Sequence, residues 1–299
     1  MCVAAGAVLL LFAGYQLWGT GWLQAAEQRS LRGELESAGL ARATVPGELA
    51  RGAGATPITE PATAPEYETG GAVGVLRIPA IGVDQVLVEG ADRDQLKLGP
   101  GHYPHSPLPG YAGNASIAGH RTTYGAPFNR IDELAPGDAI EVETAYGRFT
   151  YRVTSQQIVE PTDVSVVDRT DDNRLTLTTC HPKYSAKERL IVTAALEGDP
   201  VDAPPHVGRA EPAALPGEDV AAPKPAPVAH LDGAGSSGLA AATWGSVGWG
   251  ALLALTAAGW WFMYREGRRW TTWVGGAIPF LLVLFMFFGE VERVLPANY

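Results

Sequence analysis

The sequence predicts an all-β domain, closed into a barrel of mainly antiparallel strands with short helices, and apolar helices at both ends of the chain. Residues 71–198 alternate strand-like runs with Gly- and Pro-containing turns and show no regular strand–helix alternation. Stretches rich in Pro, Ala and Gly flank this region on both sides. Three further segments, one near the start and two near the end, are strongly apolar. We therefore expect one barrel domain held at a membrane.

Residues 1–22 are predicted to form an N-terminal transmembrane anchor. No charged side chain occurs before Glu27, and Tyr15, Trp18 and Trp22 stand where a cleaved signal peptide would carry small residues. Residues 23–70 are predicted as a stalk and linker. Spaced leucines indicate a short amphipathic helix over 23–43, and the Pro/Ala/Thr-rich composition of 44–70 is typical of an unpacked chain.

The C-terminal part is predicted to return the chain to the membrane. Residues 199–241 have the Ala/Pro-rich composition of a disordered linker, and residues 242–264 and 271–289 are apolar enough to suggest two transmembrane helices of about 20 residues each. The connector 265–270 contains three arginines, which favour the cytoplasmic side. This orientation places residues 71–198 outside the cell and residues 290–299 in an extracellular tail.

Seven strands are expected within residues 71–198, which have about the usual size of a single domain. They cover 73–78, 83–88, 115–119, 139–143, 148–158, 174–179 and 189–195. Short helical turns are expected over 127–134 and 162–166. The net charge of the whole chain is −10, which gives no electrostatic reason to expect nucleic acid as a partner.

Cys180 is the candidate nucleophile, because it is the one cysteine outside the apolar segments and ends a strand-like run. A thiolate attacks carbonyl carbon, and a neighbouring imidazole both ionises the thiol and protonates the leaving amine. His120 ends another apolar run and is the favoured base. Arg189 starts the last strand and stays charged, so it suits an oxyanion or a substrate backbone. The alternative interpretation of Cys180 is a small buried hydrophobic residue.

Other residues compete for these roles. His102 and His105 lie among prolines and are expected to be polar turn residues. His181 and Arg121 directly follow the candidates, so strand alternation would turn them to the opposite face. Thr178 shares the strand face of Cys180 and is a candidate for lining the substrate groove, as is Tyr124 through its hydroxyl.

No metal or cofactor site is predicted. The acidic run 168–173 carries oxygen ligands but lacks the spacing of a calcium loop, and a solvated turn is the favoured interpretation. Cys180 with the histidines lacks a second cysteine in the domain, so its spacing matches no standard zinc site.

The run Thr176-Leu-Thr-Thr-Cys180, with Arg189 nine residues later and Gly119-His120 upstream, resembles the signature of the sortase family of cysteine transpeptidases. The resemblance extends over the whole predicted domain. It implies an eight-stranded sortase-type β-barrel with Cys180 as nucleophile, His120 as acid/base and Arg189 as the group that orients the substrate and stabilises the oxyanion. It also implies cleavage after the Thr of an LPXTG-like sorting signal.

The resemblance further implies the partners and the setting. These are secreted proteins with a C-terminal sorting signal, an amine of a lipid II-type peptidoglycan precursor, and the plasma membrane of a Gram-positive bacterium. The domain is most similar to class E sortases of high-GC Gram-positive bacteria, which are associated with an LAXTG-like signal. Class C, which polymerises pilins, often carries a C-terminal span, but its Asp-Pro-aromatic lid motif is missing before residue 73.

Three other functions stay open at the level of the sequence. A peptidoglycan L,D-transpeptidase would need a Ser-x-Gly-Cys type run where this chain has Thr-Thr-Cys. A non-catalytic, wall-spanning scaffold would use the barrel to bind peptides without cleaving them. A thiol oxidoreductase is disfavoured because Cys-x-x-Cys is absent from the sequence.

Overall fold

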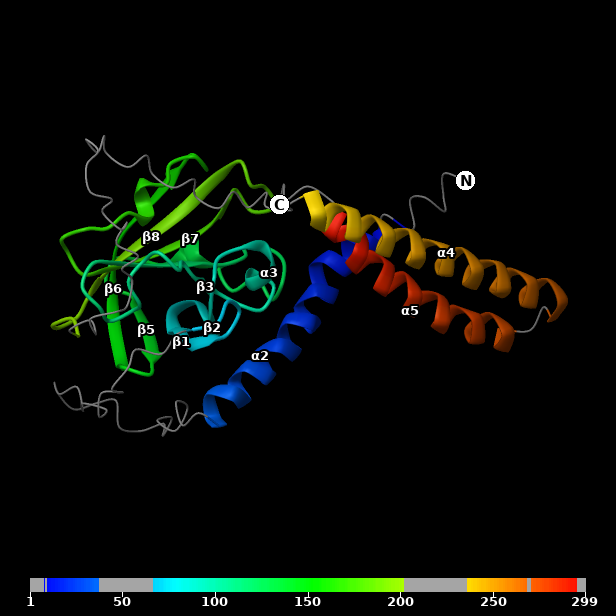
Figure 1. The fold of residues 1–299 in the computed structure, drawn as a ribbon, viewed down its shortest axis with the longest axis horizontal. Coiled ribbons are helices and arrows are strands. Elements are labelled where there is room, and N and C mark those ends of the chain that lie inside the picture. Colours follow the sequence, from blue (N-terminus) through cyan, green and yellow to red (C-terminus); the bar gives the residue numbers. More distant parts are fainter. Residues whose placement is uncertain (1–7, 9, 38–66, 202–235, 268–269, 295–299) are drawn as a thin grey trace, which may run out of the picture. The chain divides into compact units, whose positions relative to one another are not determined.

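The computed structural model describes residues 8, 10–37, 67–201, 236–267 and 270–294. The chain divides into two compact units, which we describe separately (Figure 1). One unit, Leu17–Val228, holds the barrel and the helix that precedes it. The other combines Met1–Gln16 with Ala229–Asn298. Of the predicted linkers 44–70 and 199–241, residues 44–66 and 202–235 lie outside the described residues, and residues 236–241 are helical rather than disordered.

Eight strands close the barrel in the order β1-β2-β3-β4-β7-β8-β6-β5. They are β1 (Ala72–Ile78), β2 (Val83–Glu89), β3 (Gly101–His102), β4 (Asn114–Ala118), β5 (Ala139–Thr144), β6 (Gly147–Val159), β7 (Arg174–His181) and β8 (Glu188–Leu196). The all-β barrel and each of the seven expected strands are confirmed. β3 was missed because two residues are too short to show a hydrophobic pattern. The pairing is not antiparallel throughout, since β2–β3 and β4–β7 are parallel.

Short helices connect the strands. They are η2 (Pro79–Ile81), α3 (Arg93–Leu96), η3 (Ile131–Glu133) and η4 (Ser165–Val167). The helical turn expected over 127–134 contains η3, and the turn expected over 162–166 overlaps η4. Helix α3 was not expected.

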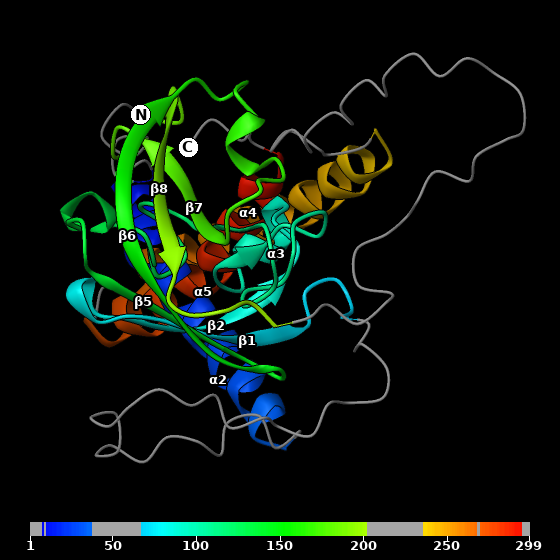
Figure 2. The ribbon, with the colours of Figure 1, turned by 90° about the vertical axis from the view of Figure 1, so that its left-hand side faces the viewer.

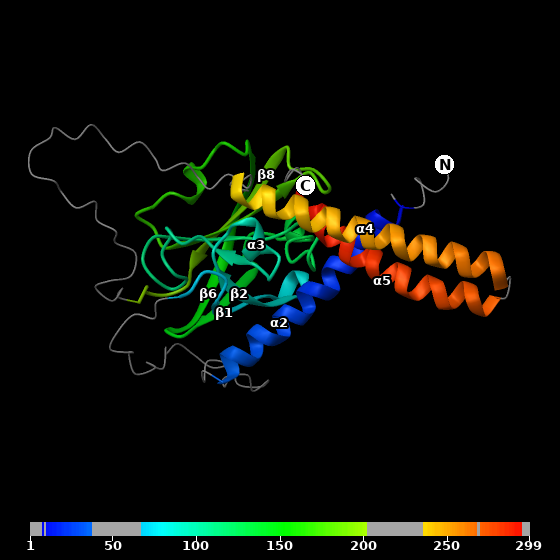
Figure 3. The same cartoon turned by 45° about the vertical axis from the view of Figure 1, so that its right-hand side comes forward.

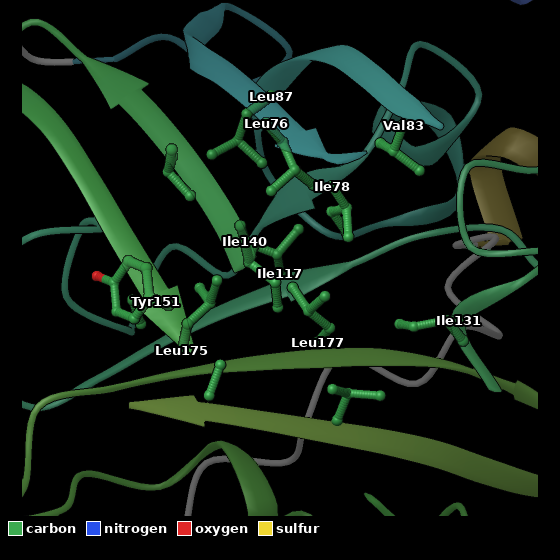
Figure 4. Packing of buried hydrophobic residues seen from close by; sticks show 14 of the residues in the cluster. Leu76, Ile78, Val83, Leu87, Ile117, Ile131, Ile140, Tyr151, Leu175 and Leu177 are labelled. Atoms are coloured by element: carbon green, nitrogen blue, oxygen red, sulfur yellow. The ribbon is translucent and has the colours of Figure 1, made fainter. Parts of the chain in front are cut away.

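Alternation along the strands builds the core. Side chains on β1, β2, β4, β5 and β7 point to the barrel interior in Figure 4, and several are fully buried: Leu76, Ile78, Leu87, Ile117, Ile140, Leu175 and Leu177. Burial of each such side chain contributes about 1.5–3 kcal/mol. Tyr151 of β6 is also buried, and its hydroxyl accepts a 2.7 Å hydrogen bond from the backbone N–H of Gly110. Desolvation raises the pKa of that phenol to about 12.

Helix α2 (Thr20–Ser37) packs on the outside of β1 and β2 (Figure 1). Leu31 and Leu35 are buried against Val75, Val86 and Val88. The amphipathic helix expected over 23–43 is therefore present as far as Ser37, and residues 38–43 lie outside the described residues. The sequence did not predict that this helix would cover the barrel.

The second unit contains η1 (Tyr15–Gly19) in part and the helices α4 (Ser236–Gly267) and α5 (Trp270–Val294), which lie side by side (Figure 3). Tyr15, Leu284 and Phe288 are buried together. Three membrane-spanning helices were expected at 1–22, 242–264 and 271–289. Within the part of the chain that the structure describes, no helix has both the length and the apolar character that crossing a membrane requires.

Candidate active site

Strands β7 and β8 place Cys180 directly beside Arg189. The two strands are antiparallel neighbours (Figure 2), and their register pairs Cys180 with Arg189 and Thr179 with Leu190. The guanidinium of Arg189 donates through Nη1 to the carbonyl oxygens of Ala186 and Glu188, at 2.9 and 3.1 Å. These hydrogen bonds hold the Arg189 side chain where the β7–β8 connection enters β8, next to Cys180.

The parallel pairing of β4 with β7 brings His120 to the same end of the barrel. Ala118 pairs with Thr178, and the Gly119 N–H donates to the Thr178 carbonyl at 3.1 Å. The hydroxyl of Thr179 donates to the carbonyl of Gly119 at 2.7 Å. His120 therefore follows the end of β4 by two residues, just as Cys180 follows Thr178 by two residues on β7.

The thiol of Cys180 is protonated at rest. Burial raises the pKa of Cys180, and the positive charges of Arg189 and then Arg121 oppose that rise. Both arginines stabilise a thiolate once it forms. The site therefore holds the thiol in its unreactive form and supplies two cations for the ionised form.

The imidazole of His120 is neutral at rest. Burial, with a smaller contribution from the positive charges of Lys97 and Arg93, lowers its pKa to about 4. The side chain keeps a partly accessible surface, but its Nε2 atom is buried without a hydrogen-bond partner among the described residues. A neutral imidazole can accept the proton of the thiol, and a thiol–imidazole pair is favoured over an ion pair in this environment.

The two candidate substrate residues flank the nucleophile and the base. The ring of Tyr124 lies 5.1 Å from that of His120, at an interplanar angle of 32°. Thr178 is buried and its hydroxyl lies 3.0 Å from the hydroxyl of Tyr103. Tyr124 covers the imidazole of His120. Thr178, two residues before Cys180 on β7, forms a hydrogen bond with Tyr103.

Tyr103 is a residue that sequence reasoning missed. Burial raises the pKa of its phenol, while the hydrogen bond to Thr178 and the charge of Arg189 oppose the shift. It reaches the site because β3 pairs with β4, placing His102 opposite Ile117. No local pattern marks a two-residue strand, so the sequence gave no signal for Tyr103.

His102 is not the polar turn residue that the sequence suggested. It is 2% exposed, its Nδ1 lies 2.9 Å from Glu89 Oε2, and its Nε2 lies 3.1 Å from the carbonyl oxygen of Pro107. Both ring nitrogens are thus occupied by groups that join β2, β3 and the following loop. His105, by contrast, is exposed.

Arg121 lies closer to the chemistry than strand alternation implied. Strand β4 ends at Ala118, so alternation does not extend to Arg121. Its side chain is 3% exposed, forms a 2.9 Å ion pair with Asp132, and donates through Nε to the Asn129 carbonyl at 3.1 Å. β7 does continue through His181, so alternation applies to that residue, whose Nδ1 is buried without a partner in the described part of the chain.

The acidic run 168–173 is tied up in local contacts. Arg174 forms a 2.5 Å ion pair with Asp172, and the backbone carbonyl of Asp168 accepts from the Asn114 amide. Across the described ranges, no group of three or more His, Cys, Asp or Glu residues is arranged to hold a metal ion.

Comparison with known proteins shows which family this chain resembles. The family model described as the sortase domain matches residues 76–197. Sortase D of Bacillus subtilis (strain 168) is 40% identical over 116 residues, which are 38% of this chain and 57% of that protein. The putative sortase YwpE of the same strain is 30% identical over 105 residues, which are 35% of this chain and 90% of that protein.

A solved structure of sortase E1 from Streptomyces coelicolor, which has a tripeptide in its active site, is 32% identical and has a TM-score of 0.41. The match covers 44% of this chain and 91% of that one. The chain spans about half the length of the curated relatives that it matches first. With the sortase model over the barrel and 30% identity across nine-tenths of a relative, the chain belongs to the sortase family.

Proposed function

We propose that this chain is a cysteine transpeptidase that cleaves a sorting signal through a thioacyl intermediate on Cys180. The observation that carries the proposal is the strand register, which pairs Cys180 with Arg189 and the last residue of β4, Ala118, with Thr178. The proposed nucleophile and a permanent cation are therefore neighbours, and the proposed base follows the end of β4 by two residues, an arrangement that suits acyl transfer.

In the first half-reaction the sulfur of Cys180 attacks the scissile carbonyl carbon while the thiol proton passes to His120. The tetrahedral oxyanion accepts a hydrogen bond from Arg189, a type of contact that contributes about 2.7–4 kcal/mol to the transition state. The imidazolium of His120 then protonates the leaving amine as the peptide C–N bond breaks. A thioester and a free amine result.

The second half-reaction runs the same groups in reverse. The attacking amine loses its proton to His120, its nitrogen bonds to the acyl carbon, and the thiolate of Cys180 leaves and is reprotonated. The neutral resting state of His120 suits this half-reaction. An imidazole with a lowered pKa accepts the proton of the amine only as the new C–N bond forms. Water in place of the amine would give hydrolysis.

We infer that the substrate is a protein with an LPXTG- or LAXTG-like C-terminal signal and that the acceptor is an amine of a lipid II-type peptidoglycan precursor. Support comes from membership of the sortase family and from the resemblance of the Thr176–Cys180 run to the sortase signature. In this proposal Thr178 and Tyr124 line the peptide groove, supported by the contact of Thr178 with Tyr103 and of Tyr124 with His120. Class E is the favoured class, and class C remains the alternative.

The proposed location is the outer face of the plasma membrane of a Gram-positive bacterium. Two features of the sequence support this proposal. One is the apolar N-terminal segment, and the other is the group of three arginines that separates the two apolar C-terminal segments. Protease treatment of intact cells tests it, because barrel peptides should be released from whole cells. Protection of the barrel until the cells are lysed would contradict the proposed location.

The transpeptidase proposal is tested with the full-length protein, LPXTG and LAXTG peptides, and an added amine. Intact-mass spectrometry should show an acyl adduct on Cys180, and the amine should convert it to a new amide. Cys180→Ala should abolish both. Binding of either peptide without an adduct would favour the non-catalytic scaffold.

Matched variants separate chemistry from folding. His120→Ala and Arg189→Ala should each lower kcat/KM at least a hundredfold. The exposed His105 and Arg130 provide the corresponding controls, His105→Ala and Arg130→Ala, which should retain activity. A loss of activity in the controls equal to that in the site variants would refute the assignment.

A further inference from the structure

Helix α2 contacts the loop that follows the candidate base. We infer that Thr20 of this helix is a positioning residue, which holds the backbone of Tyr124 so that the Tyr124 ring covers His120. The inference deepens the proposed function and rests on it only for the role of His120. It is carried by the docking of α2, the contacts at its first turn and the backbone of residues 124–126.

Most of α2 is fixed to the barrel well away from the site. The side-chain amide of Gln28 donates to the carbonyls of Val86 and Leu98, at 3.0 and 2.9 Å, and its oxygen accepts from the Val86 N–H at 2.7 Å. The edge of β2 that faces β3 has no strand beside it at Val86, because β2 pairs with β3 only through Val88 and Glu89. Gln28 therefore takes the place of a neighbouring strand there, and docks the helix in one register.

The first turn of α2 lies against the His120 loop. Thr20 is fully buried, and its hydroxyl oxygen accepts a 3.1 Å hydrogen bond from the Tyr124 N–H. Gln24, 3% exposed, packs on the next residue, since a Cβ at Gly125 would lie 2.5 Å from its Oε1. A Cβ at Gly21 would lie 3.8 Å from the Gly125 nitrogen. One face of the helix thus fits the backbone of Tyr124 and Gly125.

The loop needs this support because its conformation is strained. Tyr124, Gly125 and Ala126 have φ of 49°, 70° and 44°. Residues other than glycine rarely adopt left-handed backbone, at a cost of order 1–3 kcal/mol each. Such a conformation persists only when the surrounding structure determines it. Thr20 and Gln24 supply part of that determination from outside the barrel sequence.

The strained loop sets the surroundings of the imidazole. Tyr124 is 7% exposed, and its ring lies 5.1 Å from His120. The charged groups that act on His120 come from the α3 segment, namely Arg93 and Lys97, and both disfavour the imidazolium. The α2 side chains at this contact, Thr20 and Gln24, are uncharged. From its own loop, His120 faces the ring of Tyr124.

Loss of the Thr20 hydrogen bond should therefore let the 124–126 backbone relax and admit water to the imidazole. Desolvation is the largest cause of the lowered pKa of His120, so hydration should raise that pKa. A helix outside the barrel would in this way set the protonation state of the base.

The test is an NMR titration of ¹³C-labelled histidine in the full-length protein, which has six histidines. His120→Gln assigns the resonance. Thr20→Val keeps the shape of the side chain and removes the acceptor, and should raise the pKa of His120 by about one unit. Thr20→Ser retains the hydroxyl and should titrate as the wild type does. Arg32→Ala breaks the 2.9 Å ion pair with Asp84 farther along α2 and should leave His120 unchanged.

The outcomes discriminate between the possibilities. An unshifted titration in Thr20→Val, or an equal shift in Thr20→Ser, would overturn the inference. An equal shift in Arg32→Ala would also overturn it, because it would show general loosening. If Thr20→Val does not fold, Gln24→Ala gives the same test at the same loop. A shifted titration with an unchanged acid limb of the rate profile would retain the inference and refute His120 as the acid/base.

Discussion

A largely desolvated, neutral His120 should make the barrel less stable in mild acid. The native pKa is about 4, whereas the unfolded imidazole titrates near 6.5. Above pH 6.5 neither state binds the proton, so His120 contributes no pH dependence. Between pH 6.5 and 4 the unfolded state binds the proton and the native state does not. Stability must therefore fall as the pH falls through this window.

The size of the effect follows from the shift. A difference of about 2.5 units corresponds to about 3 kcal/mol once both states are protonated, and about 2 kcal/mol of that should be lost by pH 5. This is a large fraction of the 5–15 kcal/mol by which a domain is usually stable. Other acidic groups also titrate here, so the quantity to follow is the difference between wild type and His120→Gln.

Hydrogen exchange of β7 and β8 peptides is a suitable assay, because no tryptophan lies between residues 67 and 201. Exchange free energies of the two proteins are compared from pH 7.5 to pH 5, with each pair measured at the same pH. The stability of the wild type relative to His120→Gln should fall by about 2 kcal/mol. A difference that stays constant within about 0.5 kcal/mol would refute the largely desolvated, neutral imidazole.

Two further predictions concern packing. Gln28→Ala should destabilise the barrel by about 2–3 kcal/mol in urea unfolding, because it removes three hydrogen bonds to Val86 and Leu98, and a loss below about 0.5 kcal/mol would show that water replaces them. Gly119→Ala should cost about 1–3 kcal/mol in the same assay, since its Cβ would lie 2.5 Å from the buried Phe128 ring, whereas Gly33→Ala in α2 meets nothing within 4 Å and should be neutral or slightly stabilising.

The strands and the candidate residues could be predicted because their signals are local. β1, β2 and β4 to β8 each alternate or run apolar over five residues or more, and turns containing Gly or Pro separate several of them. Cys180, His120 and Arg189 stand at the ends of three of these runs. Their roles were carried by resemblance to the sortase family and stay predictions, while the register of β7 and β8 pairs Cys180 with Arg189.

Residues whose roles depend on distant partners escaped prediction. His102 pairs with Glu89, and Tyr103 with Thr178, across strand pairings that local sequence does not encode. The alternation rule misled for Arg121 because β4 ends two residues before His120. A periodic rule holds only while the strand continues.

By itself the sequence determined which segments become strands, where the thiol, imidazole and guanidinium occur, and that strongly apolar segments lie at both ends of the chain. These properties follow from short-range periodicity and side-chain chemistry. Only the tertiary structure decided that α2 covers β1 and β2, that Gln28 takes the place of a strand beside Val86, and that Thr20 lies against the loop of the base. The physical reason is that burial and hydrogen bonding join residues about a hundred positions apart, as in Thr20 and Tyr124. No local sequence pattern shows which distant residue covers a given side chain and excludes water from it.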